Sequence, residues 1–114
     1  MSRNRKGREH RFIAGFVDSI ERTAIIRIKG IPDLDDPEKW AVMLESRDYD
    51  IEDNSVKTFE IARIDNYHKD KPVHIHRFFE KGSPEENLNY LDFEQAREYL
   101  NSNYEEFMQR FFSR

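Results

Sequence analysis

Apolar and polar residues alternate along much of this chain, and a period of two is the pattern of β-strands. The alternation is clearest from Lys57 to Asn66, and Pro72 to Phe79 follows at a distance typical of a hairpin. The β-branched residues between Thr23 and Ile31 favour another strand. These three segments predict strands of an antiparallel sheet.

Two further segments fit either a strand or a helix. The apolar residues from Phe12 to Asp18 fit the period of a strand and the period of a helix equally well. We favour a strand because the predicted strand from Thr23 follows closely and could pair with it. From Lys39 to Asp48, alternate residues starting at Trp40 share one apolar face, which also favours a strand. A helix that begins at Asp36-Pro37 is the alternative for this second segment.

Asp92 to Phe112 has the spacing of an amphipathic helix. Asp92 can cap its first turn, with Gln95 in the capping-box position. The apolar side of this helix consists of Phe93, Ala96, Leu100, Tyr104, Phe107, Met108 and Phe111. Because this stripe must be buried, we expect an α+β fold: an antiparallel sheet of about four or five strands with the C-terminal helix packed on one face.

Composition narrows the class of protein. The 114 residues suit one domain, 37% of them are charged, and the net charge is −4. Cysteine is absent, which excludes disulfides and thiolate chemistry.

Many charged residues without cysteine are typical of thermophile proteins. We find no apolar run suited to a membrane span or a signal peptide, so we expect a cytoplasmic protein without membrane contact.

The N-terminus is basic although the chain as a whole is acidic. Its positive residues are Arg3, Arg5, Lys6, Arg8 and Arg11. We expect residues 1–9 to form a disordered basic tail and residues 10–114 to form the single α+β domain. A solvated tail and an RNA-contacting arm both fit this pattern, whereas the net negative charge argues against a protein that coats DNA.

Three of the four histidines lie between Arg63 and Arg77, in the segment that we predict to form a β-hairpin. A symmetric hairpin pairs Asp65 with His74 and Arg63 with His76, and a period of two places all four side chains on one face. A slip of one residue would scatter them. In this register Asp65 can orient the His74 ring, Arg63 can hold a phosphate, and both histidines are acid–base candidates.

Other residues border this predicted cluster. Tyr67 and His68 would lie beside it at the end of the hairpin, and Arg77 would contact phosphate only if its strand bulges. Two other interpretations of the cluster stay open. One is a polar, solvated sheet face, and the other is a metal site built from His68, His74, His76 and Asp65.

The same segment resembles the TumE-type toxins of prokaryotic toxin–antitoxin systems. The residues that carry the resemblance are Arg63-Ile64-Asp65-Asn66, His68 and His74-Ile75-His76, followed by Gly82. The resemblance extends roughly from Lys39 to Phe112, although the loop from Lys69 to Pro72 departs from the family pattern. It implies a toxin that acts on RNA and is neutralised by a co-encoded antitoxin.

We therefore expect a toxin-like, metal-independent endoribonuclease without a cofactor. Its catalytic candidates are His74, His76, Arg63, Asp65 and His68, and its substrate-binding candidates are Tyr67 and Arg77. The expected partners are an RNA substrate, an antitoxin protein and, in a homodimer, a second copy of the chain. The alternative is a non-catalytic protein-interaction module, which gains support if the helix covers the cluster or the cluster lies on a flat surface.

Overall fold

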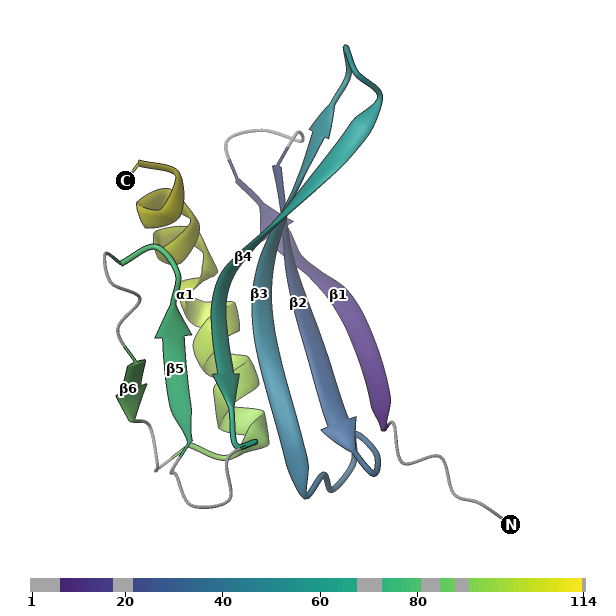
Figure 1. Cartoon of the computed structure of the whole chain (residues 1–114), viewed down its shortest axis with the longest axis vertical. Helices are drawn as coiled ribbons and strands as arrows, with labels where there is room; N and C mark the ends of the chain where they lie inside the picture. The colour runs from purple at the N-terminus through teal and green to yellow at the C-terminus, as the bar shows by residue number, and fades with distance from the viewer. Residues whose placement is uncertain (1–6, 18–21, 68–72, 81–84, 88–90, 114) are drawn as a thin grey trace.

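The computed structural model describes residues 7–17, 22–67, 73–80, 85–87 and 91–113. Six strands form one antiparallel sheet in the order of the sequence, and a single described helix lies against it (Figure 1). The elements are β1 (Arg8–Phe16), β2 (Arg22–Ile31), β3 (Lys39–Asp50), β4 (Ser55–Asp65), β5 (His74–Arg77), β6 (Glu85–Asn87) and α1 (Phe93–Ser113). The predicted α+β fold is confirmed, with the short β6 added to the expected strands.

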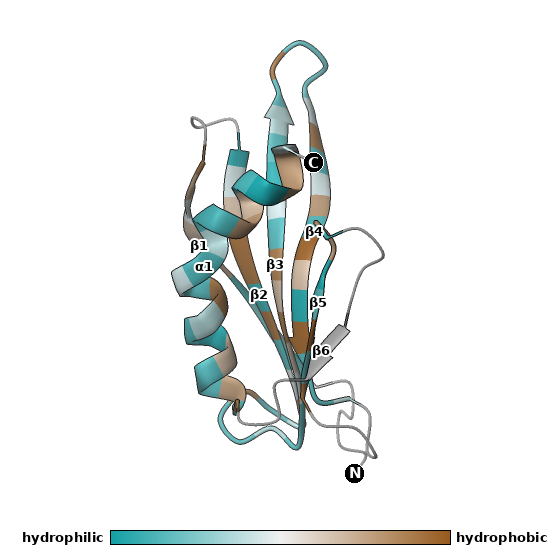
Figure 2. Ribbon diagram, turned by 90° about the vertical axis from the view of Figure 1, so that its left-hand side faces the viewer, coloured by the Kyte–Doolittle hydropathy of each residue, from teal (hydrophilic) through white to brown (hydrophobic). Residues whose placement is uncertain are grey.

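The core lies between α1 and one face of the sheet, which we call the helix face (Figure 2). Ile26 of β2 pairs with Leu44 of β3, and both are fully buried on this face. Leu100 and Met108 bring the apolar stripe of α1 against them. Both ambiguous segments are strands, because alternate residues of each supply this face with apolar side chains.

The first turn of α1 has the predicted capping box. The Gln95 backbone N–H donates to Asp92 Oδ1 at 2.8 Å, and the Asp92 backbone N–H donates to Gln95 Oε1 at 3.0 Å. Two donors that lack partners inside a helix are satisfied in this way, which fixes where α1 begins.

Three boundaries differ from the prediction. Strand β1 begins at Arg8, so Arg8 and Glu9 belong to the sheet and not to a tail, because Arg8 pairs with Gly30 and Glu9 forms ion pairs with Arg11 and Arg27. Residues 1–6 of the predicted tail lie outside the described residues.

Strands β3 and β4 are longer than predicted and continue past the body of the sheet as a two-stranded projection, the β3–β4 arm (residues 49–56) (Figure 1). A turn at residues 51–54 joins the two strands, and Asn54 in it adopts the left-handed conformation that asparagine tolerates. Glu86 lies in the short strand β6 and pairs with Ile75. Within the described residues, no helix has the length and apolar character to cross a membrane.

Candidate functional site

The β4–β5 hairpin has the predicted register. Arg63 pairs with His76 and Asp65 pairs with His74, as the symmetric hairpin requires. Ile64 pairs with Ile75 between these two pairs, and both isoleucines are fully buried on the helix face. Burial of this apolar pair fixes the register, because a slip of one residue would bury the polar residues instead.

The four polar residues therefore lie on the opposite side of the sheet, which we call the open face. The contacts of α1 with the sheet fall on the helix face, and no other described element is packed over the open face. Across β3, Met43 lies beside Arg63 and the small Ala41 lies beside Asp65. The helix therefore does not cover the cluster, although Asp65 and His74 are themselves buried.

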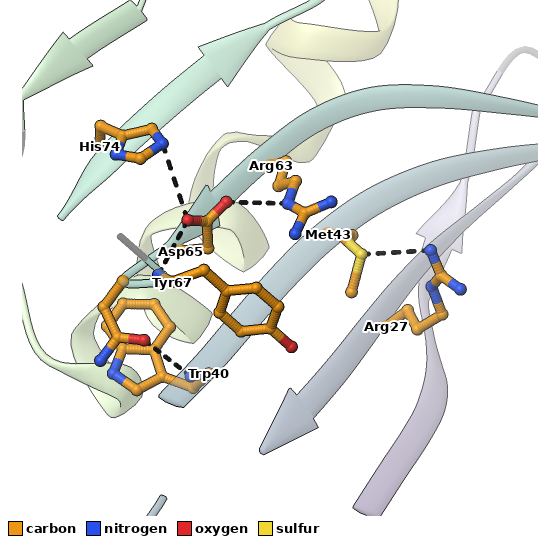
Figure 3. Close-up of polar contacts among 8 residues, drawn as sticks. Arg27, Trp40, Met43, Arg63, Asp65, Tyr67 and His74 are labelled. Atoms are coloured by element: carbon orange, nitrogen blue, oxygen red, sulfur yellow. Dashed lines mark hydrogen bonds and ion pairs between the residues drawn. The ribbon is translucent and has the colours of Figure 1, made fainter. Parts of the chain in front are cut away.

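Asp65 is the centre of the cluster (Figure 3). Its Oδ2 accepts a 2.8 Å hydrogen bond from Arg63 Nε, and its Oδ1 accepts a 3.2 Å bond from the Tyr67 backbone N–H. His74 Nε2 lies 3.6 Å from the same Oδ1. Asp65 is 3% exposed, so its charge is balanced by neighbouring side chains and backbone rather than by bulk water.

The two histidines differ in accessibility. His74 is 1% exposed, whereas His76 is half-buried and lines a cavity of about 390 Å³. Their ring centroids are 4.9 Å apart and the rings are nearly perpendicular, at 84°. The other residues that line the cavity are Glu60, Arg63, Asp65, Tyr67 and Phe78. Of the two, only His76 lines the cavity, so only His76 can directly meet a molecule bound there.

Tyr67 extends from the end of β4 beside the cluster (Figure 3). Its hydroxyl is buried and has no hydrogen-bond partner among the described residues. Burial raises the pKa of this hydroxyl above the ordinary tyrosine range, Arg63 opposes the rise, and Asp65 and Glu9 add to it. The hydroxyl therefore keeps its proton at neutral pH.

Tyr67→Phe is expected to make the protein less sensitive to alkaline pH. The raised folded-state pKa means that the unfolded chain releases the phenolic proton first as pH rises through about 10, so the free energy of unfolding falls there. The contribution is fully present below that pH and is lost above it. Urea unfolding at about pH 9 and about pH 11 measures the drop.

The matched control for this experiment is Tyr49→Phe, because Tyr49 is exposed on the β3–β4 arm and bonds to Asn54. We expect a smaller alkaline drop for Tyr67→Phe than for Tyr49→Phe or wild type. Equal drops in all three proteins would contradict burial as the cause of the raised Tyr67 pKa.

Two predicted site residues do not join the cluster. Arg77 lies on the helix face, paired with Ala62, and its Nη2 lies 3.5 Å from the Tyr99 hydroxyl of α1. The register between β4 and β5 is regular, without the bulge that Arg77 would need to reach the open face, so Arg77 does not join the cluster. His68 lies outside the described residues.

The structure adds residues that the sequence analysis missed. Phe78 stacks on the His76 ring, with centroids 6.1 Å apart, and the period of two from His76 was a signal that could have found it. Arg27 shares a row across the sheet with Met43, Arg63 and His76, and its Nη2 lies 3.1 Å from Met43 Sδ. This row depends on the pairing of four strands, which no local signal contains.

Comparison with known proteins gives one result. A family model described as a domain of unknown function (DUF7718) matches residues 3–114. Comparisons with curated proteins and with solved structures give no match. Because the family model covers nearly the whole chain, this protein belongs to the DUF7718 family.

Proposed function

We propose that this protein is a toxin-like endoribonuclease that cleaves the RNA backbone without a metal ion. The observation that carries the proposal is the convergence of His76, Arg63 and Tyr67 on one open cavity, with buried Asp65 behind them. Phosphodiester cleavage needs a base and a cation that binds the phosphate, and the His76 imidazole and the Arg63 guanidinium can supply them. The resemblance to TumE-type toxins supports the same class of substrate.

In the proposed reaction, His76 accepts the proton of a ribose 2′-hydroxyl, and that oxygen attacks the adjacent phosphorus. The new bond joins the 2′-oxygen to phosphorus, while the bond from phosphorus to the 5′-oxygen breaks. The leaving 5′-oxygen takes a proton from solvent water, and His76 later returns the proton it accepted to solvent. The products are a 2′,3′-cyclic phosphate and a free 5′-hydroxyl, so RNA is cleaved and DNA is not.

Arg63 is assigned to the phosphate. Its guanidinium lies at the cavity, held by the Nε hydrogen bond to Asp65, and its Cζ is 5.5 Å from the centre of the Tyr67 ring. One edge of the guanidinium is thus anchored, which leaves donors on the terminal nitrogens for the non-bridging oxygens of the substrate. Negative charge that builds on phosphorus during attack would be stabilised there.

His74 is a positioning residue in this proposal. It is too buried to meet RNA, yet its ring lies edge-on to His76 and faces Asp65. In this proposal, Asp65 orients the His74 ring, and the edge contact of that ring with His76 orients the His76 ring beside the cavity. Phe78 and Tyr67 supply aromatic surfaces on which an unstacked RNA base can rest.

Induced expression in bacteria tests the proposal. We expect wild type to arrest growth and to produce cleaved RNA with 2′,3′-cyclic phosphate ends, whereas His76→Ala gives normal growth and intact RNA. His10→Ala is the control, because His10 is exposed on the helix-face side of β1 and lies apart from the cluster. Normal growth and intact RNA with soluble wild type would contradict the proposal.

A second candidate function is a non-catalytic interaction module. The observation that favours it is the β3–β4 arm, on which Tyr49, Ile51 and Val56 are large exposed apolar residues. Tyr49 and Val56 are cross-strand neighbours, and acidic residues lie around them, a combination that suits a partner with apolar and basic groups. Loss of function on Tyr49→Ser/Val56→Ser, with His76→Ala fully active, would favour this module.

A further inference from the structure

We propose that Asp65, His74 and His76 form a binding site for Zn²⁺ and that the bound ion switches the ribonuclease off. One ligand atom from each of these residues lies within 4.8 Å of the other two. Two imidazole nitrogens and one carboxylate oxygen are a common set of zinc ligands. The switch rests on the proposed function, whereas the metal site itself does not.

The spacing of the ligand atoms is close to what zinc requires. Ligands at about 2.0–2.2 Å from a tetrahedral ion lie roughly 3.3–3.6 Å from one another. His74 Nε2 and Asp65 Oδ1 are 3.6 Å apart, so these two buried groups already have the required separation. Only His76 has to turn inward, and it is the least buried of the three.

Asp65 is oriented for this role by the residues around it. Arg63 binds Oδ2, which leaves Oδ1 directed toward His74. Metal-binding carboxylates are commonly held by such outer hydrogen bonds, and Oδ1, which also accepts the Tyr67 backbone N–H, keeps a second lone pair for an ion. The Arg63 charge opposes a dication, but its side chain is 34% exposed, so water screens part of this repulsion.

The donor set selects the kind of cation. Nitrogen donors from two imidazoles suit late first-row ions such as Zn²⁺, whereas Mg²⁺ prefers oxygen ligands in octahedral geometry. His76 borders the cavity, so the fourth position of the ion would face the same space as the substrate. Three protein ligands and one open position would therefore hold zinc where RNA has to enter.

Zinc and catalysis compete for the same atoms. Zinc takes the lone pair of the imidazole nitrogen, and an imidazole bound in this way cannot accept the 2′-hydroxyl proton. No bond of the RNA is broken in this step, because the ion only occupies the base. The protein would then be active in a chelator and inhibited by zinc, the opposite of a zinc hydrolase.

The experiment measures zinc affinity of the full chain by competition with a chromogenic chelator. We expect one Zn²⁺ per chain, no displacement by excess Mg²⁺, and affinity at least about 100-fold weaker in His76→Ala and in Asp65→Asn. His10→Ala is the matched control and should bind as wild type does. Circular dichroism identifies any variant that fails to fold. If one of the two ligand variants is unfolded, the other still tests the site.

RNA cleavage by the same samples separates this inference from the proposed function. Cleavage in chelator that one equivalent of zinc suppresses at least about 10-fold supports both. Cleavage in chelator without stoichiometric zinc binding, or binding that survives in both ligand variants, overturns the zinc site and leaves the ribonuclease. Tight binding by wild type without cleavage in chelator overturns the ribonuclease and the switch, and leaves the metal site.

Discussion

His76→Ala is expected to lower the rate of RNA cleavage by about 10²–10⁴-fold, the usual contribution of a general base. His76 is the one histidine of the cluster that borders the cavity, so no neighbouring imidazole among the described residues can replace it at the substrate. The change should leave the fold intact, because the side chain is only half-buried and Ile75 holds the same strand, β5, in the core. Single-turnover cleavage of a short RNA in chelator measures the rate.

Two comparisons make this result specific. His10→Ala removes an imidazole of similar size from β1 and should cleave at the wild-type rate. Tyr67→Phe removes only a buried hydroxyl and should also cleave at close to the wild-type rate. A His76→Ala protein that is folded and cleaves within about threefold of wild type would rule out His76 as the base, since that margin is well below the expected effect.

Ile75→Ala should lower the free energy of unfolding by about 2–5 kcal/mol, the range for truncating a fully buried aliphatic side chain. Ile75 is 0% exposed and lies between the two histidines on the same four-residue strand, with its side chain on the helix face. It is the residue that ties β5 to the core, because His74 and His76 point to the other side. Losing it should therefore also loosen the candidate site.

Urea unfolding of Ile75→Ala, Ile75→Val and Val56→Ala tests this role. The valine variant should lose about 0.5–1.5 kcal/mol, as a single methylene usually costs. Val56→Ala removes an aliphatic group that is 58% exposed on the β3–β4 arm, and it should change stability by less than about 0.5 kcal/mol. Similar losses for Ile75→Ala and Val56→Ala would contradict the assignment of Ile75 to the core.

The sequence contained enough information for the hairpin register. Ile64 and Ile75 are apolar, and each lies between two polar residues of its strand. A register that pairs the two isoleucines buries both of them on one face, whereas a slip of one residue does not. From that pairing follows the alignment of Arg63 with His76 and of Asp65 with His74. The same reasoning places Arg77 on the helix face, and its phosphate role required a bulge that the strand lacks.

Accessibility within the cluster could not be predicted in this way. His74 and His76 have the same residue type, face and strand, yet one is 1% exposed and the other borders the cavity. The difference arises from the neighbours each ring meets in three dimensions, Asp65 for His74 and Phe78 for His76. Periodicity specifies the direction of a side chain, but not what lies above it.

By itself, the sequence determined the local features of this protein: the strands, the capped C-terminal helix, and the face on which each alternate residue lies. These follow from periodicity and hydrogen bonding over a few residues, which are contained in the chain locally. Only the tertiary structure decided that α1 does not cover the cluster, that Arg27 joins its row, and that His76 rather than His74 borders the cavity. Each of these depends on contacts between residues far apart in sequence, whose burial is set by packing of the whole sheet.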